Sequence, residues 1–313
     1  MIKQAFVLGA GLGTRLRPLT AEMPKPLVPI FQKPLITFSL DHLRSVGIES
    51  FVINTHRLKE QFERAFASGK YRGVPLRLLH EPDLLETGGG IKNAETWLRS
   101  EPFIVYSGDI LTDVDLQPLI DAHFRDGNQV TLALRNTGLA TAVAFRDGRV
   151  IDISNRYGHP GTHDFANISI WNPDVFARIA PGAKTSFVPI VGEWIGQGGK
   201  IGAVVLNERR WFNIGSREGY LEVHRTVAED GWRPAYLDGD KWPASVAPDA
   251  EVDRSAELSG WNSIGSGCRV GAGARLHNTI LFPGAQIASR SDLSSCIVRA
   301  HRKAEGTLRD IDI

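Results

Sequence analysis

Short apolar segments alternate with segments of helical periodicity through the first hundred residues of the chain. The pattern predicts strands at residues 5–8, 51–53, 76–79 and 103–106, and helices at 35–46, at 58–66 and through residue 98. Gly47 stands where the first helix is expected to end, because glycine readily adopts the left-handed conformation that closes a helix. The alternation favours an α/β fold with a Rossmann-like, mostly parallel sheet and flanking helices, in which ligands bind at the carboxyl ends of the strands.

The pattern changes after about residue 235, where aliphatic residues begin to recur every six positions. They are Val246, Val252, Leu258, Ile264, Val270 and Leu276, followed after a shift of register by Ile280 or Leu281, Ile287 and Leu293. A hexapeptide period predicts a short left-handed parallel β-helix, and a β-meander with an accidental period is the alternative. We therefore expect a first domain at residues 1–235, a β-helix domain at 243–300, and a polar tail at 301–313 to which the pattern assigns no structure.

The charge balance excludes some classes of partner. Lysine and arginine number 36 against 35 acidic residues, so no basic field favours nucleic acid or a membrane surface. The chain has no apolar run of about 20 residues and no signal peptide at its start. Two cysteines are too few for a disulfide framework. These features predict a cytoplasmic protein.

The segment after the first predicted strand combines glycines with cations. Gly9, Gly11 and Gly13 alternate there, and Arg15 and Lys25 follow them. Glycines let backbone N–H groups approach an anion closely, and the cations beside them favour a polyphosphate ligand. A tight strand-to-helix turn would also explain the glycines. It does not explain a lysine between two prolines. The fixed φ angles of the prolines restrict the direction of the lysine side chain.

Two well-known phosphate loops do not fit this segment. The Walker loop requires Gly-Lys-Ser/Thr, whereas Gly13 is followed by Thr14 and Arg15. The dinucleotide-binding fingerprint requires a glycine where Thr14 stands. The loop therefore belongs to neither class.

An aspartate follows the predicted strand at 103–106. Asp109, after Gly108, lies where a carboxylate beside a polyphosphate would bind Mg²⁺. A helix N-cap is the alternative role for Asp109.

Further polar and glycine-rich positions fall near other predicted strand ends. Thr87, Gly88 and Gly89 belong to a second glycine cluster, which suits an anion or a flat base, or else forms a hinge. Glu81 stands where it could accept N–H groups of a base. Asn167 interrupts an apolar strand, so its amide is expected to meet a ligand hydroxyl.

Together these segments resemble the sugar-1-phosphate nucleotidylyltransferases. The matching pieces are residues 8–20, Pro24-Lys25-Pro26-Leu27, residues 86–90, Gly108-Asp109 and residues 211–215. The β-helix resembles the C-terminal domain of mannose-1-phosphate guanylyltransferases. Residues 85–91 and 107–113 are most similar to N-acetylmuramate-1-phosphate uridylyltransferases.

The resemblance implies an EC 2.7.7 enzyme that converts an NTP and a sugar 1-phosphate into a nucleotide sugar and pyrophosphate. The exposed ends of the short β-helix separately predict a homo-oligomer formed through this domain. GTP with mannose 1-phosphate and UTP with N-acetylmuramate 1-phosphate are the substrate pairs that the resemblance favours. It implies catalytic roles for Arg15, Lys25 and Asp109, and sugar contacts for Asn167 and Gly108. The implied nucleotide-binding residues are Leu8, Gly9, Ala10, Gly11, Gly13, Thr14, Glu81, Thr87, Gly88 and Gly89.

One position departs from the family pattern. The resemblance implies that Asp109 and the residue at position 213 hold Mg²⁺, but the family's usual aspartate is replaced here by Asn213. Asparagine keeps an oxygen and loses the charge, so metal binding is expected to be weaker. A catalytically weak regulatory subunit that binds nucleotide sugars is therefore the alternative function.

Overall fold

The computed structural model describes residues 1–138, 140–237, 239 and 241–313. The chain forms two compact units. The first unit comprises residues 1–12 and 36–211, and the second comprises residues 13–35 and 212–313. The predicted domain boundary at residue 235 follows the change in the sequence pattern and stays a prediction. No helix in the described part of the chain is long and apolar enough to cross a membrane.

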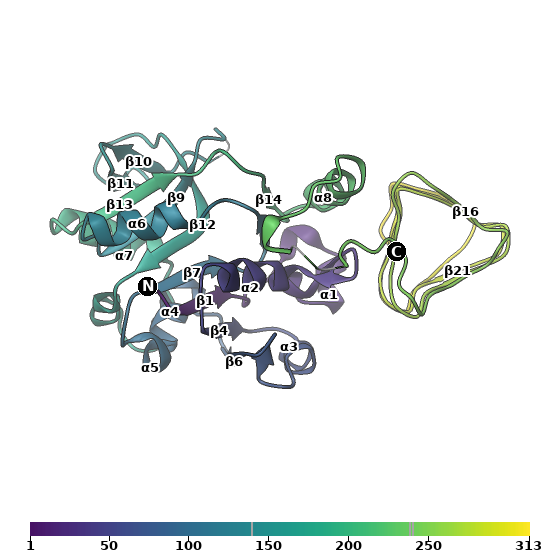
Figure 1. Ribbon diagram of the computed structural model, residues 1–313, viewed down its shortest axis with the longest axis horizontal. Coiled ribbons are helices and arrows are strands. Elements are labelled where there is room, and N and C mark those ends of the chain that lie inside the picture. The colour runs from purple at the N-terminus through teal and green to yellow at the C-terminus, as the bar shows by residue number, and fades with distance from the viewer. Residues whose placement is uncertain (139, 238, 240) are drawn as a thin grey trace. The chain divides into compact units, whose positions relative to one another are not determined.

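The first unit is built on a mixed sheet with the strand order β10-β11-β13-β9-β12-β7-β1-β4-β6-β5 (Figure 1). Its strands are β1 (Gln4–Leu8), β4 (Ser50–Thr55), β5 (Lys70–Tyr71), β6 (Val74–His80), β7 (Phe103–Ser107), β9 (Val130–Arg135), β10 (Val143–Arg146), β11 (Arg149–Ile153), β12 (Asp164–Trp171) and β13 (Ile201–Val205). A short strand β8 (Ile110–Thr112) lies outside this sheet. β7, β1, β4 and β6 pair in parallel, and β12 runs antiparallel between β7 and β9. The predicted α/β fold and its four strands are confirmed.

Helices cover both faces of this sheet. They are α2 (Leu35–Ser45), α3 (Lys59–Ala65), α4 (Glu86–Asn93), α5 (Glu95–Leu98), α6 (Gln117–Arg125), the 3₁₀ helix η3 (Pro173–Arg178) and α7 (Phe187–Gly196). α4, α5 and α7 share an apolar core with Val130 and Leu132 of β9. Thr131 points to the opposite face, because side chains alternate along a strand, and there it meets His123 of α6 at 2.9 Å. Loops, and not the helices that cover the faces, surround the carboxyl ends of the parallel strands.

The second unit combines an early segment of the chain with its last hundred residues. Its non-repeat elements are η1 (Thr14–Leu16), α1 (Leu19–Glu22), η2 (Lys25–Leu27), β2 (Pro29–Ile30), β3 (Lys33–Pro34), β14 (Trp211–Asn213), α8 (Arg217–Glu229) and η4 (Ala235–Leu237). Tyr220 Oη donates to the Pro29 carbonyl oxygen at 2.5 Å, and Trp242 Nε1 donates to that of Ile30 at 2.8 Å. Residues 13–35 are thereby packed against α8 and the segment that leads into the repeats.

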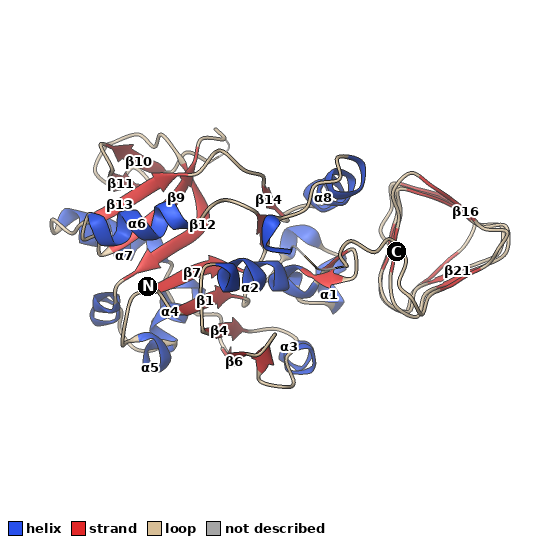
Figure 2. Ribbon diagram, in the orientation of Figure 1, coloured by secondary structure: helices blue, strands red, loops and turns tan. Residues whose placement is uncertain are grey.

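The repeat region is a parallel β-helix. Its strands are β15 (Glu251–Val252), β16 (Glu257–Ser259), β17 (Ser263–Ile264), β18 (Arg269–Val270), β19 (Arg275–His277), β20 (Ile280–Leu281), β21 (Gln286–Ile287), β22 (Asp292–Ser294), β23 (Ile297–Val298), β24 (Lys303–Ala304) and β25 (Thr307–Arg309). They stack as β15-β18-β21-β24, β16-β19-β22-β25 and β17-β20-β23, the three sides of the coil in Figure 2. Every pairing between neighbours is parallel among the described residues, which excludes the β-meander.

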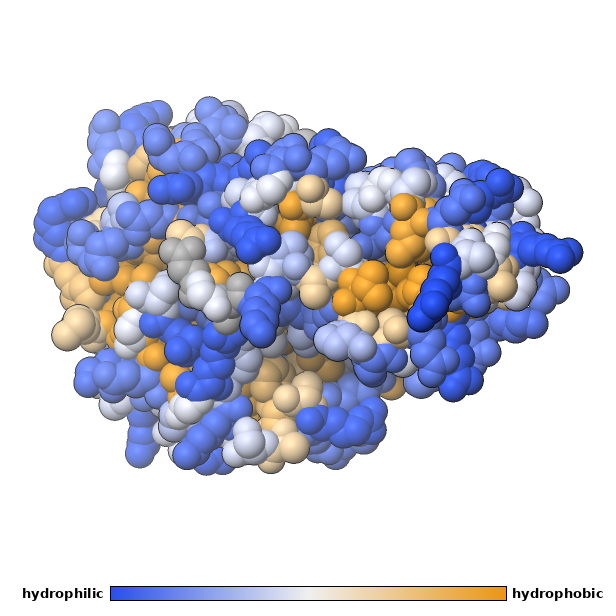
Figure 3. Space-filling model, turned by 45° about the vertical axis from the view of Figure 1, so that its right-hand side comes forward, coloured by the Kyte–Doolittle hydropathy of each residue, from blue (hydrophilic) through white to orange (hydrophobic). Residues whose placement is uncertain are grey.

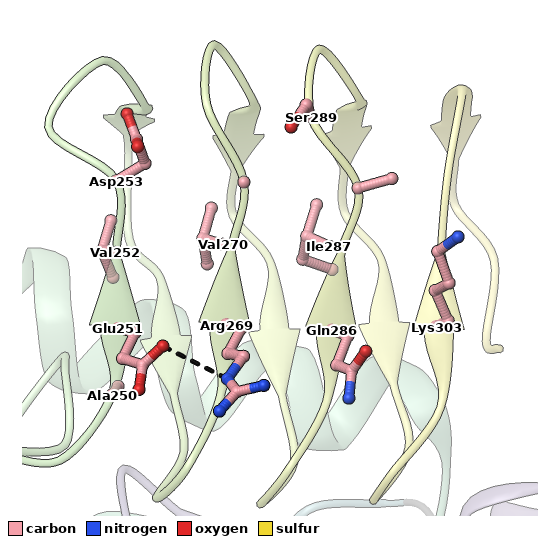
Figure 4. Close-up of a pocket in the computed structure, with 12 residues that line it drawn as sticks. Ala250, Glu251, Val252, Asp253, Arg269, Val270, Gln286, Ile287, Ser289 and Lys303 are labelled. Carbon is pink, nitrogen blue, oxygen red and sulfur yellow. Dashed lines mark ion pairs between the residues drawn. The ribbon is translucent and has the colours of Figure 1, made fainter.

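The aliphatic residues of the six-residue period stack in rows within this β-helix. Val252, Val270 and Ile287 occupy successive rungs of one sheet, and Figure 4 shows them in line. Val270 and Ile287 are buried. The outward residues of this sheet are polar, and Arg269 pairs there with Glu251 at 3.2 Å. The sequence pattern assigned no structure to residues 301–313, yet they add β24 and β25 to the stack.

The last coil of the β-helix contacts α1 and α8, the two helices that border the predicted site residues of the second unit. Arg299 Nη1 lies 3.1 Å from Glu22 Oε1 at the end of α1, and Arg302 pairs with the same carboxylate. Arg217, the first residue of α8, bonds through Nε to Asp312 Oδ1 at 2.7 Å and through Nη2 to the Ser295 carbonyl oxygen at 2.5 Å. The coil therefore holds α1 and the start of α8 in one place.

The face of the molecule drawn in Figure 3 is largely hydrophilic, with apolar side chains in small groups. Two exposed apolar residues belong to the first coil of the β-helix, namely Val246 (37% exposed) and Leu258 (41% exposed). Leu276, one coil further along, is buried beneath the stack. The first coil therefore leaves exposed the aliphatic positions that a preceding coil would cover.

Candidate active site

The glycines of the first loop serve different purposes. Gly9 N donates to Asn54 Oδ1 at 2.8 Å, and a Cβ atom at Gly9 would lie only 2.6 Å from the Asn54 carbonyl oxygen. A Cβ atom at Gly11 would meet nothing within 4 Å. Gly9 is therefore explained by packing against β4, whereas Gly11 is exposed and open to a ligand.

Asn54 is a site-supporting residue that the sequence pattern missed. Its Nδ2 donates to Glu81 Oε1 at 2.8 Å, and Leu85 N donates to Glu81 Oε2 at 3.1 Å. Glu81 is fully buried, and this burial raises the pKa of its carboxyl group, while the hydrogen bonds from Asn54 and Leu85 act in the opposite direction. Both carboxylate oxygens thus accept donors from the protein, and the expected contact of Glu81 with a base stays a prediction. The network ties the first glycine loop to the start of the second glycine cluster.

The second glycine cluster lies in the first half of α4, where close packing requires the missing side chains. A Cβ atom at Gly88 would lie 2.8 Å from the Ser186 carbonyl oxygen, and one at Gly89 would lie 2.1 Å from that of Ala183. A Cβ atom at Gly90 would come within 2.9 Å of Glu81 Oε1. Packing therefore accounts for these glycines, and a contact of Gly88 and Gly89 with a base remains a prediction.

Asp109 follows the carboxyl end of β7, which is fixed against β1. Gly108 N donates to the Leu8 carbonyl oxygen at 2.9 Å, and a Cβ atom at Gly108 would lie 2.7 Å from the same oxygen. Ser107 Oγ donates to Asp109 Oδ1 at 2.7 Å. The carboxylate is thus oriented at the edge of the sheet where ligands of α/β folds bind.

A small pocket opens at the same edge of the first unit. It has a volume of about 100 Å³ and is lined by Leu8, Thr87, Val105, Ser107, Phe165, Asn167, Ser169, Trp171 and Phe187. Three predicted site residues, Leu8, Thr87 and Asn167, are thereby brought together. Asn167 has a φ of 63° at an irregularity of β12, and its side-chain amide bonds to no other residue in the described part of the chain.

The remaining predicted site residues belong to the second unit. Gly13 has a φ of 60°, and a Cβ atom there would lie 3.1 Å from Lys25 Cβ. Lys25 is only 6% exposed, whereas Thr14 and Arg15 are exposed. The loop at Gly13 is thus packed directly against the lysine between the two prolines.

Arg15 and Asn213 meet around Gly215. A Cβ atom at Gly215 would lie 3.1 Å from Arg15 Nη2 and 3.1 Å from Asn213 Oδ1. Gly215 is buried, so a larger residue there would displace one of these side chains. The arrangement places a cation beside a neutral amide oxygen, which suits a phosphate group with a bound cation.

Among the described residues, no group of three or more histidine, cysteine, aspartate or glutamate side chains could hold a metal ion. Mg²⁺ does not require such a group, because it binds through one or two protein oxygens together with substrate phosphates. Asp109, with an oriented carboxylate, and Asn213, with an exposed amide oxygen, are donors of the required kind.

Residues 4–230 match the family model described as nucleotidyl transferase. The chain belongs to this family. A mannose-1-phosphate guanylyltransferase of Mycobacterium tuberculosis is 30% identical over 290 residues, which cover 90% of this chain and 80% of the relative. An N-acetylmuramate alpha-1-phosphate uridylyltransferase of Neisseria meningitidis serogroup B is 44% identical over 113 residues, 36% of this chain and 49% of that protein. The resemblance to sugar-1-phosphate nucleotidylyltransferases is confirmed, and this nucleotidyl transferase is an enzyme of the EC 2.7.7 type.

The fold of this nucleotidyl transferase also occurs in a solved structure described as a glucose-1-phosphate thymidylyltransferase from Bacillus anthracis. The TM-score is 0.64 at 18% identity, and the match covers 74% of this chain and 96% of that one. At this level of identity the likeness supports the fold alone.

Proposed function

We propose that this nucleotidyl transferase moves a nucleotidyl group from an NTP to a sugar 1-phosphate. An oxygen of the sugar phosphate attacks the α-phosphorus, the bond from that phosphorus to the bridging oxygen breaks, and pyrophosphate leaves with the bonding electron pair. No covalent intermediate with the protein is required. Catalysis then depends on positioning and on neutralising the phosphate charges.

The observation that carries this proposal is the grouping of Arg15 with Asn213 around Gly215. A guanidinium group binds phosphate oxygens through two parallel hydrogen bonds, and it would neutralise the departing pyrophosphate. A neutral amide beside it avoids the repulsion that a second anion would add. This pair therefore fits a polyphosphate substrate better than it fits an uncharged one.

The other residues supply complementary roles. Gly11, with open space in place of a side chain, would present its backbone N–H to the triphosphate. Lys25, buried and held between prolines, would neutralise charge that develops on the α-phosphate. Asn167 would donate to or accept from a sugar hydroxyl, since its amide bonds to no other described residue.

Asp109 and Asn213 would hold Mg²⁺. When bound, this cation supplies neutralisation of the triphosphate charge. Ser107 keeps the Asp109 carboxylate in one orientation by donating to Oδ1. Because Asn213 carries no charge, the protein contributes a single anionic ligand, and the substrate phosphates provide most of the remaining attraction.

GTP with mannose 1-phosphate and UTP with N-acetylmuramate 1-phosphate are the substrate pairs that we propose first, since relatives named for them match this chain. The test is a matrix of four NTPs against several sugar 1-phosphates, in which pyrophosphate release is measured through a coupled pyrophosphatase. Release that requires both substrates is expected. Absence of release in every combination would overturn the proposal and favour the regulatory alternative.

A further inference from the structure

The small pocket of the first unit is surrounded by the motifs of that unit. Leu8 precedes the first glycine loop, Thr87 begins the second glycine cluster, and Ser107 is hydrogen-bonded to Asp109 at 2.7 Å. A group bound in this pocket would therefore lie one side chain away from the carboxylate assigned to the reaction. Its volume of about 100 Å³ has room for about three waters or for a substituent of a few non-hydrogen atoms.

One side of the pocket is aromatic. The rings of Phe165 and Phe187 lie 4.9 Å apart between centroids, and Trp171 meets Phe187 edge-on at 6.4 Å. Trp171 and Val105 are almost completely buried. Such a wall favours a methyl group and offers no hydrogen bond to a lone hydroxyl, which would have to give up its bonds to water there.

A hydroxyl group provides the polar part of the same wall. Ser169 is 1% exposed, and its Oγ accepts the indole N–H of Trp171 at 2.7 Å. A serine hydroxyl carries one proton beside its lone pairs, so the proton of Ser169 can be donated to a ligand. No acceptor for this proton lies among the described residues. The Asn167 amide, also without a protein partner in the described chain, lies on the same pocket.

We propose that this pocket receives a small acylamino substituent, such as an acetamido group, of the sugar 1-phosphate. The acyl carbonyl accepts the Ser169 proton, and the acyl methyl packs against the rings of Phe165, Trp171 and Phe187. This inference rests on the proposed function and narrows its substrate class. A hexose with only hydroxyl groups would leave the aromatic wall without a complement, because a hydroxyl carries no methyl group to pack against the rings.

The first test compares two substrates that differ only at one substituent. Pyrophosphate release from the unmodified full chain is measured with N-acetylglucosamine 1-phosphate and with glucose 1-phosphate, each with all four NTPs and Mg²⁺. The acetamido sugar is expected to give a kcat/KM at least about tenfold higher, the lower end of the discrimination that one added carbon group supplies in an apolar pocket. Equal values, or a preference for glucose 1-phosphate, overturn this inference and leave the proposed function standing. Release with no sugar 1-phosphate overturns both.

The second test removes the hydroxyl. Ser169→Ala is expected to lower kcat/KM for the acetamido sugar about tenfold while changing that for glucose 1-phosphate much less. Ser291→Ala, which alters another buried serine in the β-helix, is the matched control and should leave the ratio of the two values unchanged. Thermal unfolding checks that both variants fold. An unchanged ratio in folded Ser169→Ala contradicts the inference, and if that variant does not fold, the substrate comparison decides alone.

Discussion

Arg299 of the last β-helix coil lies 3.1 Å from the carboxylate of Glu22, which ends the short helix that follows Arg15. Arg302 pairs with the same carboxylate. A β-helix coil and the segment that carries Arg15 are therefore parts of one packed unit. The consequence is that the ion pairs between Glu22 and the repeat domain should influence turnover without touching a substrate.

Glu22→Gln should lower kcat about tenfold, because small displacements of groups that hold a substrate cost much in rate. Its effect on stability should be below about 1 kcal/mol, since the pair is partly exposed. Steady-state kinetics and urea unfolding measure the two effects separately. Glu305→Gln, which breaks an exposed pair with Lys303 inside the same coil, is the matched control and should leave kcat unchanged. Equal kcat values in all three proteins would refute the coupling.

Lys25→Ala should lower kcat by about 10²–10³, the usual loss for one electrostatic group that acts in the transition state. Arg15→Ala should also slow turnover and should leave the fold intact, since its side chain is exposed. Lys3→Ala, at an exposed pair with Glu49, controls for the loss of a lysine in general. Undiminished turnover in a folded Lys25→Ala protein would remove Lys25 from the mechanism.

Asn213→Asp should lower the Mg²⁺ concentration that gives half-maximal rate. A carboxylate attracts the hard cation more strongly than a neutral amide oxygen does. The measurement is the initial rate across a Mg²⁺ titration at saturating NTP. If the half-maximal concentration stays the same, Asn213 is not a metal ligand and serves to hold the segment around Gly215.

Stability should fall as the pH is lowered through the range in which free histidine titrates. Burial among the rings of Phe31, Tyr220 and Trp261 lowers the pKa of His224 from 6.5 to about 4. Above pH 6.5 His224 is neutral in both states. Between pH 6.5 and 4 the unfolded chain binds a proton that the folded chain does not, which costs about 3 kcal/mol over the whole window. Burial also lowers the pKa of His42 to about 4, so that residue adds a similar loss.

Urea unfolding at pH 7 and pH 5 measures this loss. His224→Gln should reduce the loss of stability between the two pH values by the part that His224 contributes. The part contributed by His42 should remain. A variant that loses as much stability between the two pH values as the unmodified protein would show that His224 is not responsible.

Leu258→Asp should reduce self-association. Leu258 is 41% exposed at the open first coil, where the β-helix lacks a further coil to cover its aliphatic positions, and a second copy of the chain would supply that cover. Light scattering at micromolar concentration measures the oligomeric state. Phe124→Asp, at an exposed apolar residue of α6 outside the β-helix, is the control and should not change it. An unmodified protein that is monomeric under these conditions would contradict the prediction.

The sequence pattern predicted the elements of the sheet well because their signals are local. Each central strand is a short apolar run, and the repeat follows a regular period with one shift of register, so neither needs knowledge of distant residues. The pattern did not predict the strands within residues 301–313. Ala304 has too small a side chain to mark the six-residue period, and Leu308 follows it after only four residues.

The sequence pattern singled out residues of the candidate site, but it did not show why each of them is needed there. The second glycine cluster looked like a ligand-binding surface, yet Gly88 and Gly89 pack against the backbone of residues 183–186, about a hundred positions away. The sequence pattern did not indicate a role for Asn54, because a single asparagine at a strand end belongs to no recognisable motif. Its role follows from contacts with Gly9 and Glu81, which only the folded chain brings together.

The second unit is built from two segments that lie far apart in the chain. The order in which these segments are synthesised therefore matters for folding. Glu22 and Arg302 are 280 positions apart, and Trp242 and Ile30 are 212 apart. At a synthesis rate of about 5–20 residues per second, residues 13–35 leave the ribosome tens of seconds before their partners exist. The first unit has nearly all of its sheet by residue 205, but the loop that carries Arg15 and Lys25 must wait for the final coil. A chain released early would hold a finished sheet and a phosphate loop without its contacts to the last coil, and we expect such a chain to turn over substrate more slowly.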